Sequence, residues 1–173
     1  MSDDTEPTLK TWPDGRREWR LNGLLHRLDG PAEEHLDGSY QRWSHHGLLH
    51  RLDGPAISDN QGQEIWAVDG KYHRLDGPAR IYSNGSRQWY VNGKCHREDG
   101  PAFEGCSGLA EWWYQGKMHR LDGPALTGPN GEPLEWWVYG HQIEGDIASW
   151  VSRRNFSWPW DEQTQLEFLL TWT

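Results

Sequence analysis

The string HRLDGPA occupies residues 26–32 and returns at residues 50–56, 73–79 and 119–125. A fifth copy, at residues 96–102, reads HREDGPA. We call this string the HRxDGPA motif. Its copies begin 23 or 24 residues apart, and a fixed period in this range is the signature of a repeat architecture.

Tryptophan follows the same period as the motif. One tryptophan precedes each copy by seven residues, and a sixth stands where a further repeat would place it. These residues are Trp19, Trp43, Trp66, Trp89, Trp112 and Trp136. Because neighbouring repeats stack to bury one continuous core, this column is predicted to be the core stripe.

Three turn signals divide each repeat. In the fourth repeat they are Asn84-Gly85, Asn92-Gly93 and the Asp99-Gly100 of the motif. Asn-Gly and Asp-Gly supply the positive φ angles that tight hairpin turns need. Apolar residues alternate between the turns, as with Trp89 and Val91, which is the pattern of a half-buried strand.

These patterns predict an all-β fold. We expect an elongated array of about six antiparallel β-hairpin units over residues 11–145. Residues 1–10 are acidic and predicted to be disordered. Residues 146–173 are predicted to form a helical cap of one or two short helices, the first N-capped by Asp146 and the second starting at Pro159 or Asp161.

Composition excludes several classes of partner. The chain has 17 basic and 26 acidic residues, a formal net charge of −9, so it has no general attraction for nucleic acid or anionic membranes. No apolar run approaches the ~20 residues of a membrane span, and the polar N-terminus does not resemble a signal peptide. Cys95 and Cys106 are predicted to be thiols in a reducing cytoplasm, with a disulfide as the alternative for an exported protein. We therefore expect a cytoplasmic protein.

Three stretches carry a resemblance to a known family. Residues 66–73, 89–96 and 112–119 each run from a Trp to Gly-Lys-x-His, at a period near 23. They resemble the MORN repeat (membrane occupation and recognition nexus), although a MORN unit usually continues with Gly-x-Gly where this chain has Arg-x-Asp-Gly-Pro-Ala. The chain is most similar to a group of bacterial and phage proteins with W..NGK.HR.DGPA repeats and a short helical tail. The resemblance implies a β-hairpin array and no particular activity, since the group has no agreed one and MORN arrays serve mostly as scaffolds.

The motif has two interpretations, and the structural one is favoured. Arg27 and Asp29 can pair on one side of the chain while His26 and Leu28 take the other side. Asp-Gly opens a turn, Pro interrupts strand pairing, and the Ala is small enough to lie under a neighbouring Trp. Each residue of the motif thus has a role in a corner that every repeat must form.

The alternative is a row of sites for nucleotide-like anions, since arginine binds phosphate and aromatic rings stack on bases. Equivalent histidines of successive repeats are expected roughly 10–14 Å apart at ~4.8 Å per strand, too far to share a metal ion, so we expect no metal and no cofactor. His35, His45 and His46 lie outside the motif, and no spacing singles them out. The residues of the alternative are His26, Arg27, His50, Arg51, His73, Arg74, His96, Arg97, His119 and Arg120.

The leading functional hypothesis is non-catalytic protein binding, by an inhibitor or scaffold of phage or bacterial type. Doubled tryptophans at 112–113 and 136–137 place aromatic rings on both faces of the sheet, and the tail is rich in aromatic residues. The tail has two interpretations, a lid over the last hairpin or an interface for a partner or a second copy. No catalytic motif is present, so we do not expect an enzyme. The candidate contact residues are Tyr90, Trp113, Tyr114, Trp137, Trp150, Trp158, Trp160 and Trp172.

Overall fold

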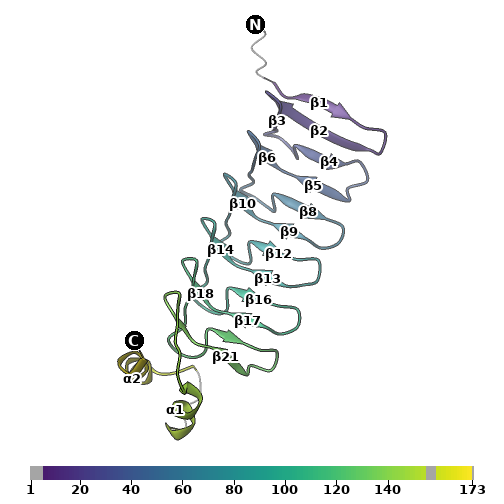
Figure 1. Ribbon diagram of the computed structural model, residues 1–173. Helices are drawn as coiled ribbons and strands as arrows, with labels where there is room; N and C mark the ends of the chain where they lie inside the picture. The colour runs from purple at the N-terminus through teal and green to yellow at the C-terminus, as the bar shows by residue number, and fades with distance from the viewer. Residues whose placement is uncertain (1–5, 155–158, 173) are drawn as a thin grey trace. The chain divides into compact units, whose positions relative to one another are not determined.

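The computed structural model describes residues 6–154 and 159–172 of the chain. The repeats contribute two kinds of hairpin, one in a long sheet and one small and separate (Figure 1). In one repeat, β8 (Ile57–Asp59) and β9 (Glu64–Ile65) form a hairpin of a long antiparallel sheet. Trp66 follows, and β10 (Ala67–Val68) and β11 (Lys71–Tyr72) form a small hairpin of their own. The HRxDGPA motif then leads back to the long sheet.

The chain divides into two units, and the first comprises Met1–Lys94. Its long sheet has the order β1-β2-β4-β5-β8-β9-β12-β13, with antiparallel pairs throughout. Small hairpins join β2 with β3, β6 with β7 and β10 with β11. The remaining strands are β1 (Thr8–Thr11), β2 (Arg16–Leu21), β3 (Leu24–Leu25), β4 (Glu33–His35), β5 (Tyr40–Arg42), β6 (Ser44–His45), β7 (Leu48–Leu49), β12 (Arg80–Ile81), β13 (Arg87–Gln88) and β14 (Tyr90–Val91); β15 (Lys94–Cys95) lies at the boundary between the units.

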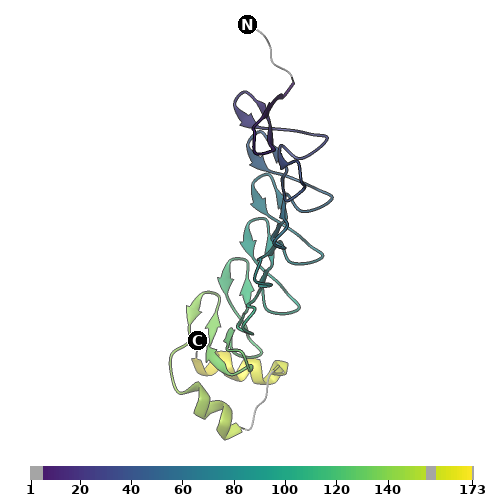
Figure 2. The same cartoon turned by 90° about the vertical axis from the view of Figure 1, so that its right-hand side faces the viewer.

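The second unit comprises Cys95–Thr173 and repeats the same plan. Its long sheet has the order β16-β17-β20-β21, and small hairpins join β18 with β19 and β22 with β23. Two helices follow the last hairpin (Figure 2). The elements are β16 (Phe103–Glu104), β17 (Ala110–Glu111), β18 (Trp113–Tyr114), β19 (Lys117–Met118), β20 (Leu126–Thr127), β21 (Pro133–Glu135), β22 (Trp137–Val138), β23 (His141–Gln142), α1 (Ile147–Arg154) and α2 (Glu162–Trp172).

The turns of the small hairpins have one conformation. The first turn residue has φ of 48–51° and the glycine after it has φ of 75–86°. Two successive positive φ angles define the type I′ turn, whose twist matches that of paired strands. The turns predicted for the small hairpins are therefore confirmed, whereas the Asp-Gly of the motif is not a turn of this kind, because Gly30, Gly54, Gly77 and Gly100 have no positive φ. The small-hairpin turns are Asn22-Gly23, His46-Gly47, Asp69-Gly70, Asn92-Gly93, Gln115-Gly116 and Tyr139-Gly140.

The all-β hairpin array with C-terminal helices is confirmed, but two details differ from the prediction. The array begins at Thr8, which pairs with Arg20, so residues 8–10 are not disordered, whereas residues 1–5 lie outside the described part. The expected continuous strand through the Trp is present at Trp19, which lies within β2, but it is interrupted at the later tryptophans of the column. The Trp66 amide donates to the Ala79 carbonyl (2.7 Å) and the Trp66 carbonyl accepts from the His73 amide (3.1 Å). The tryptophan thus pairs with the motif of its own repeat.

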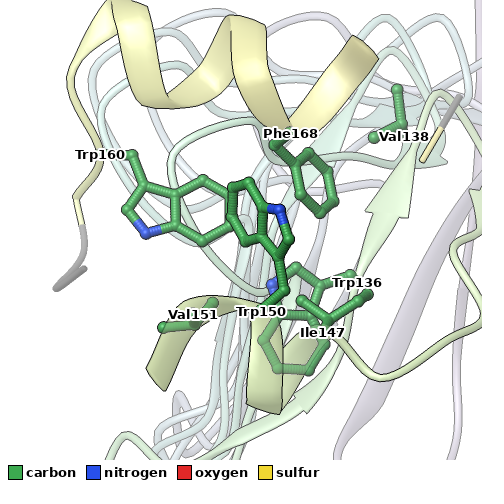
Figure 3. Close-up of a cluster of buried hydrophobic side chains, with 7 residues drawn as sticks. All are labelled: Trp136, Val138, Ile147, Trp150, Val151, Trp160 and Phe168. Atoms are coloured by element: carbon green, nitrogen blue, oxygen red, sulfur yellow. The ribbon is translucent and has the colours of Figure 1, made fainter. Parts of the chain in front are cut away.

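The two helices begin where the sequence predicts. Asp146 accepts a hydrogen bond from the Ser149 amide (3.0 Å), and Asp161 accepts one from the Thr164 amide (2.8 Å). Their apolar side chains cover the last repeat in one buried cluster (Figure 3). The members are Trp136, Val138, Ile147, Trp150, Val151, Trp160 and Phe168.

Neither helix has the length and apolar character that a membrane-spanning segment needs, within residues 6–154 and 159–172. The two cysteines are thiols. Cys95 is buried, Cys106 is exposed, and no disulfide joins them.

Candidate functional site

The histidine of the HRxDGPA motif connects its repeat to the next one. Each motif histidine accepts, at Nδ1, a hydrogen bond from the backbone amide of the first turn residue in the following small hairpin, at 3.1–3.3 Å. The glycine after that turn residue donates to the carbonyl that precedes the histidine, at 2.8–2.9 Å. Two hydrogen bonds per repeat therefore fix each turn on its neighbour. The histidine and turn pairs are His26 with His46, His50 with Asp69, His73 with Asn92, His96 with Gln115 and His119 with Tyr139.

The arginine of the motif holds the corner together. Its Nε donates to the motif aspartate at 2.6–2.9 Å, and its Nη1 donates to the carbonyl of the motif proline at 3.2–3.4 Å. Four of these guanidinium groups lie 3.9–4.1 Å above the ring of the repeat's own tryptophan. The motif alanines are fully buried. These contacts match the structural interpretation of the motif.

The same contacts weigh against an anion site at the motif. A phosphate would have to compete with the aspartate that already accepts from the arginine. A base could not stack on Trp19, Trp43 or Trp66 from the side that the guanidinium covers. The arginines proposed for nucleotide-like ligands are thus bound to the motif aspartates, and the proposed histidines are bound to the amides of the next turn.

In four of the motifs, the arginine lowers the pKa of the aspartate that it binds, and this predicts that stability depends on pH. The hydrogen bond from the neighbouring guanidinium, together with its charge, lowers the pKa of Asp29, Asp53, Asp76 and Asp99 below the ordinary value. The unfolded chain therefore binds more protons than the folded one once the pH falls below about 3.9, so acid should destabilise the array. Denaturant titrations between about pH 6 and pH 2 should show the free energy of unfolding falling on the acid side.

The double variant Asp53→Asn/Asp76→Asn provides the comparison for this prediction. It should show a shallower acid limb because two of the titrating groups are gone. An unchanged acid limb would mean that other carboxylates cause the acid sensitivity.

The leucine of the motif is the least buried of its apolar residues. Leu28, Leu52 and Leu75 are 76%, 80% and 80% exposed. Leu52 and Leu75 line a groove of about 900 Å³ between successive motifs of the N-terminal unit, together with Trp66 and Val68. Three large apolar side chains at one repeat position are thus presented to solvent.

The last motif, in the C-terminal unit, has its leucine covered by the chain's own tail. Leu121 packs against the buried cluster of the helices. The Trp160 amide donates to the Asp122 carbonyl (2.8 Å), and Gln165 of α2 lines the remaining groove at this motif. The molecule therefore contains an example of a polypeptide segment docked on a motif leucine.

The predicted aromatic contact residues fall into separate groups. Trp113 and Trp137 are half-buried, donate their indole N–H to Glu111 (2.8 Å) and Glu135 (2.6 Å), and line a groove of about 410 Å³. Tyr90 and Tyr114 are also half-buried.

The tail residues in that prediction are mostly enclosed. Trp150 and Trp160 are buried in the cap and Trp172 packs against it, so Trp150 and Trp160 present no contact surface and the tail acts as a lid. Trp158 lies outside the described residues.

A histidine cluster was missed by the sequence analysis. Among the described residues, His26, His45 and His46 form a group whose possible metal-ligating atoms all lie within 4.8 Å of one another. Their ring centroids are 4.3–4.8 Å apart. His26 is buried, and this burial, followed by the proximity of His46 and His45, lowers its pKa. The available signal was that His45 stands where other repeats carry Val68, Val91 or Val138.

Comparisons with known proteins identify no family for this chain. A scan against models of protein families found no match for the chain, and a search among curated proteins found none either. The MORN-like identity stays a prediction from the repeat pattern.

Proposed function

We propose that this chain is a non-catalytic protein-binding module, acting as a scaffold or inhibitor, that binds an amphipathic helix of a partner across the motif leucines of its N-terminal unit. One observation carries the proposal. Leu28, Leu52 and Leu75 are exposed at the position where, in the last motif, a segment of the chain itself covers Leu121.

The repeat geometry specifies the kind of helix. Each repeat adds two strands to the long sheet, so equivalent leucines are about 10 Å apart at ~4.8 Å per strand. An α-helix advances about 10.5 Å in seven residues. A partner helix with an apolar side chain at every seventh position therefore matches successive leucines.

Charge adds a second requirement on the partner. The leucines are flanked by the motif aspartates Asp29, Asp53 and Asp76, whose side chains are 81–84% exposed. The whole chain carries a formal charge of −9. Basic residues beside the apolar positions of the partner would speed association and set its orientation.

A helical peptide library displayed against the full chain tests this proposal. Selected peptides should carry apolar residues at a spacing of seven with basic neighbours. The double variant Leu52→Glu/Leu75→Glu should weaken their binding at least about 30-fold, because charging two central apolar contacts removes a hot spot. Affinities can be measured by fluorescence anisotropy.

Two control variants locate the contact. Leu170→Glu alters an equally exposed leucine on α2, 80% exposed, and should leave peptide affinity unchanged. Trp113→Ser/Trp137→Ser alters the aromatic groove of the C-terminal unit, which we regard as the second candidate surface. Peptides that depend on these tryptophans and tolerate the leucine variant would move the binding site there. A selection that enriches no peptide would refute the proposal.

A further inference from the structure

We infer that His26, His45 and His46 form a binding site for a zinc ion, with three imidazole ligands and a fourth position open to water or to a partner side chain. The site belongs to the N-terminal unit and is independent of the proposed leucine surface. It rests on the convergence of three imidazole groups from two successive repeats.

The other repeats show that the fold does not require these side chains. The residue equivalent to His45 is apolar in each of the other five repeats: Leu21, Val68, Val91, Tyr114 and Val138. The residue equivalent to His46 is Asn22, Asp69, Asn92, Gln115 or Tyr139. The hydrogen bond between the repeats uses only the backbone amide of position 46, so it does not require a histidine side chain there. Two adjacent histidines therefore replace residues with which the same hairpin forms elsewhere in the chain.

The distances between the ligand atoms of the three histidines fit a zinc ion after small rotations of two of the rings. Zinc–nitrogen bonds of ~2.0–2.1 Å in a tetrahedral site place the nitrogens about 3.3 Å apart. The possible ligand atoms of the three histidines lie within 4.8 Å of one another. His26 is buried and fixed, whereas His45 is half-buried and His46 is exposed, so rotation of these two rings can close the gap.

His26 is buried and offers a lone pair at Nδ1, the kind of nitrogen that binds a metal ion. Nδ1 accepts the His46 amide at 3.1 Å, which places the lone pair of the neutral ring on this nitrogen. Zinc would bind Nδ1 in exchange for that hydrogen bond, and the exchange makes the site weaker than a preformed zinc site.

A fourth histidine, His50, is nearby, but its Nδ1 already contacts a carboxylate. The ring of His50 is 5.7 Å from that of His45, centroid to centroid, and its Nδ1 lies 2.8 Å from an Asp69 carboxylate oxygen. Three nitrogen ligands with one open position is the arrangement of zinc sites that bind a further ligand. Imidazole ligands also favour zinc over magnesium or calcium, which prefer oxygen.

Calorimetric titration of the full chain with Zn²⁺ tests the site, with Co²⁺ absorption as the probe of geometry. We expect one ion per chain, a rise in Tm with zinc, and the intense visible bands of tetrahedral Co²⁺. His45→Val and His46→Asn should each weaken zinc binding more than the 10- to 100-fold that loss of an outer-shell partner produces. Both substitutions restore residues that other repeats use, so Tm without zinc should be unchanged.

A matched control separates the site from the structural role of the motif. His73→Gln removes a motif histidine that bonds the Asn92 amide and has no place in the cluster. It should lower Tm without altering zinc affinity. The inference is overturned if zinc produces no one-to-one heat, if Co²⁺ gives only weak octahedral bands, or if His45→Val and His46→Asn bind zinc within about threefold of the unaltered chain.

Discussion

Replacing Phe168 with alanine is expected to lower the free energy of unfolding of the C-terminal unit by about 3–5 kcal/mol, the range for a fully buried phenylalanine. Phe168 has no exposed surface, and its ring lies 5.1 Å from that of Trp160 and 6.0 Å from that of Trp150 (Figure 3). The change removes these contacts and leaves a cavity between α2 and the last repeat. Urea titration of the full chain, followed by tryptophan fluorescence, measures the loss.

Leu170→Ala is the matched control on the same helix. Leu170 is 80% exposed, so its truncation should change the free energy of unfolding by no more than about 0.5 kcal/mol. A Phe168→Ala variant as stable as the unaltered chain would show that α2 does not pack on the last repeat in solution. The tail would then be available as the interface that the sequence left open.

The positions of the small-hairpin turns could be predicted because they depend on the residue types within the turns themselves. Asn22-Gly23, Asp69-Gly70 and Asn92-Gly93 have a local preference for positive φ, and the structure gives them type I′ turns. Asp146 and Asp161 identified the two helix starts for the same reason, since an N-cap depends on residues within one turn.

The environment of each side chain was harder to predict, because it depends on the neighbouring repeat. Alternation assigned Trp66 to a continuous strand, yet its backbone pairs with Ala79 and His73. Hydrophobicity alone would bury Leu75, whereas the chain leaves it 80% exposed and buries the small Ala79. The guanidinium of the motif arginine, and not the motif leucine, lies over the tryptophan ring, as Arg74 does over Trp66.

The histidine cluster could not be predicted from the sequence pattern, because it depends on contacts between successive repeats. His26 lies about one repeat before His45 and His46, and they meet because successive hairpins stack. Position-by-position comparison of the repeats would have marked His45 as the exception in an apolar column. Periodicity shows what the repeats share, and the departures from it indicate where a particular repeat differs in chemistry.

Replacing Arg74 with alanine should lower the free energy of unfolding of the N-terminal unit by about 2–3 kcal/mol, through loss of the stack on a tryptophan and of a charged hydrogen-bond donor. Arg74 lies 3.9 Å above the Trp66 ring and donates to the Pro78 carbonyl at 3.4 Å. Its ion pair with Asp76 adds little, because that carboxylate is 84% exposed and screened by water. Circular dichroism during urea titration of the full chain gives the value.

Three further variants show which contact of Arg74 matters. Arg74→Lys keeps the charge but lacks the planar group, so it should lose most of the same stability. Asp76→Asn should cost only a little stability at pH 7, because the carboxylate is exposed and an amide oxygen still accepts from Arg74. Leu75→Ala, the exposed neighbour, should change stability by no more than about 0.5 kcal/mol. If Arg74→Ala leaves the array as stable as before, the arginine is not needed to form the corner, and its repetition in all five motifs would instead favour the binding of an external anion.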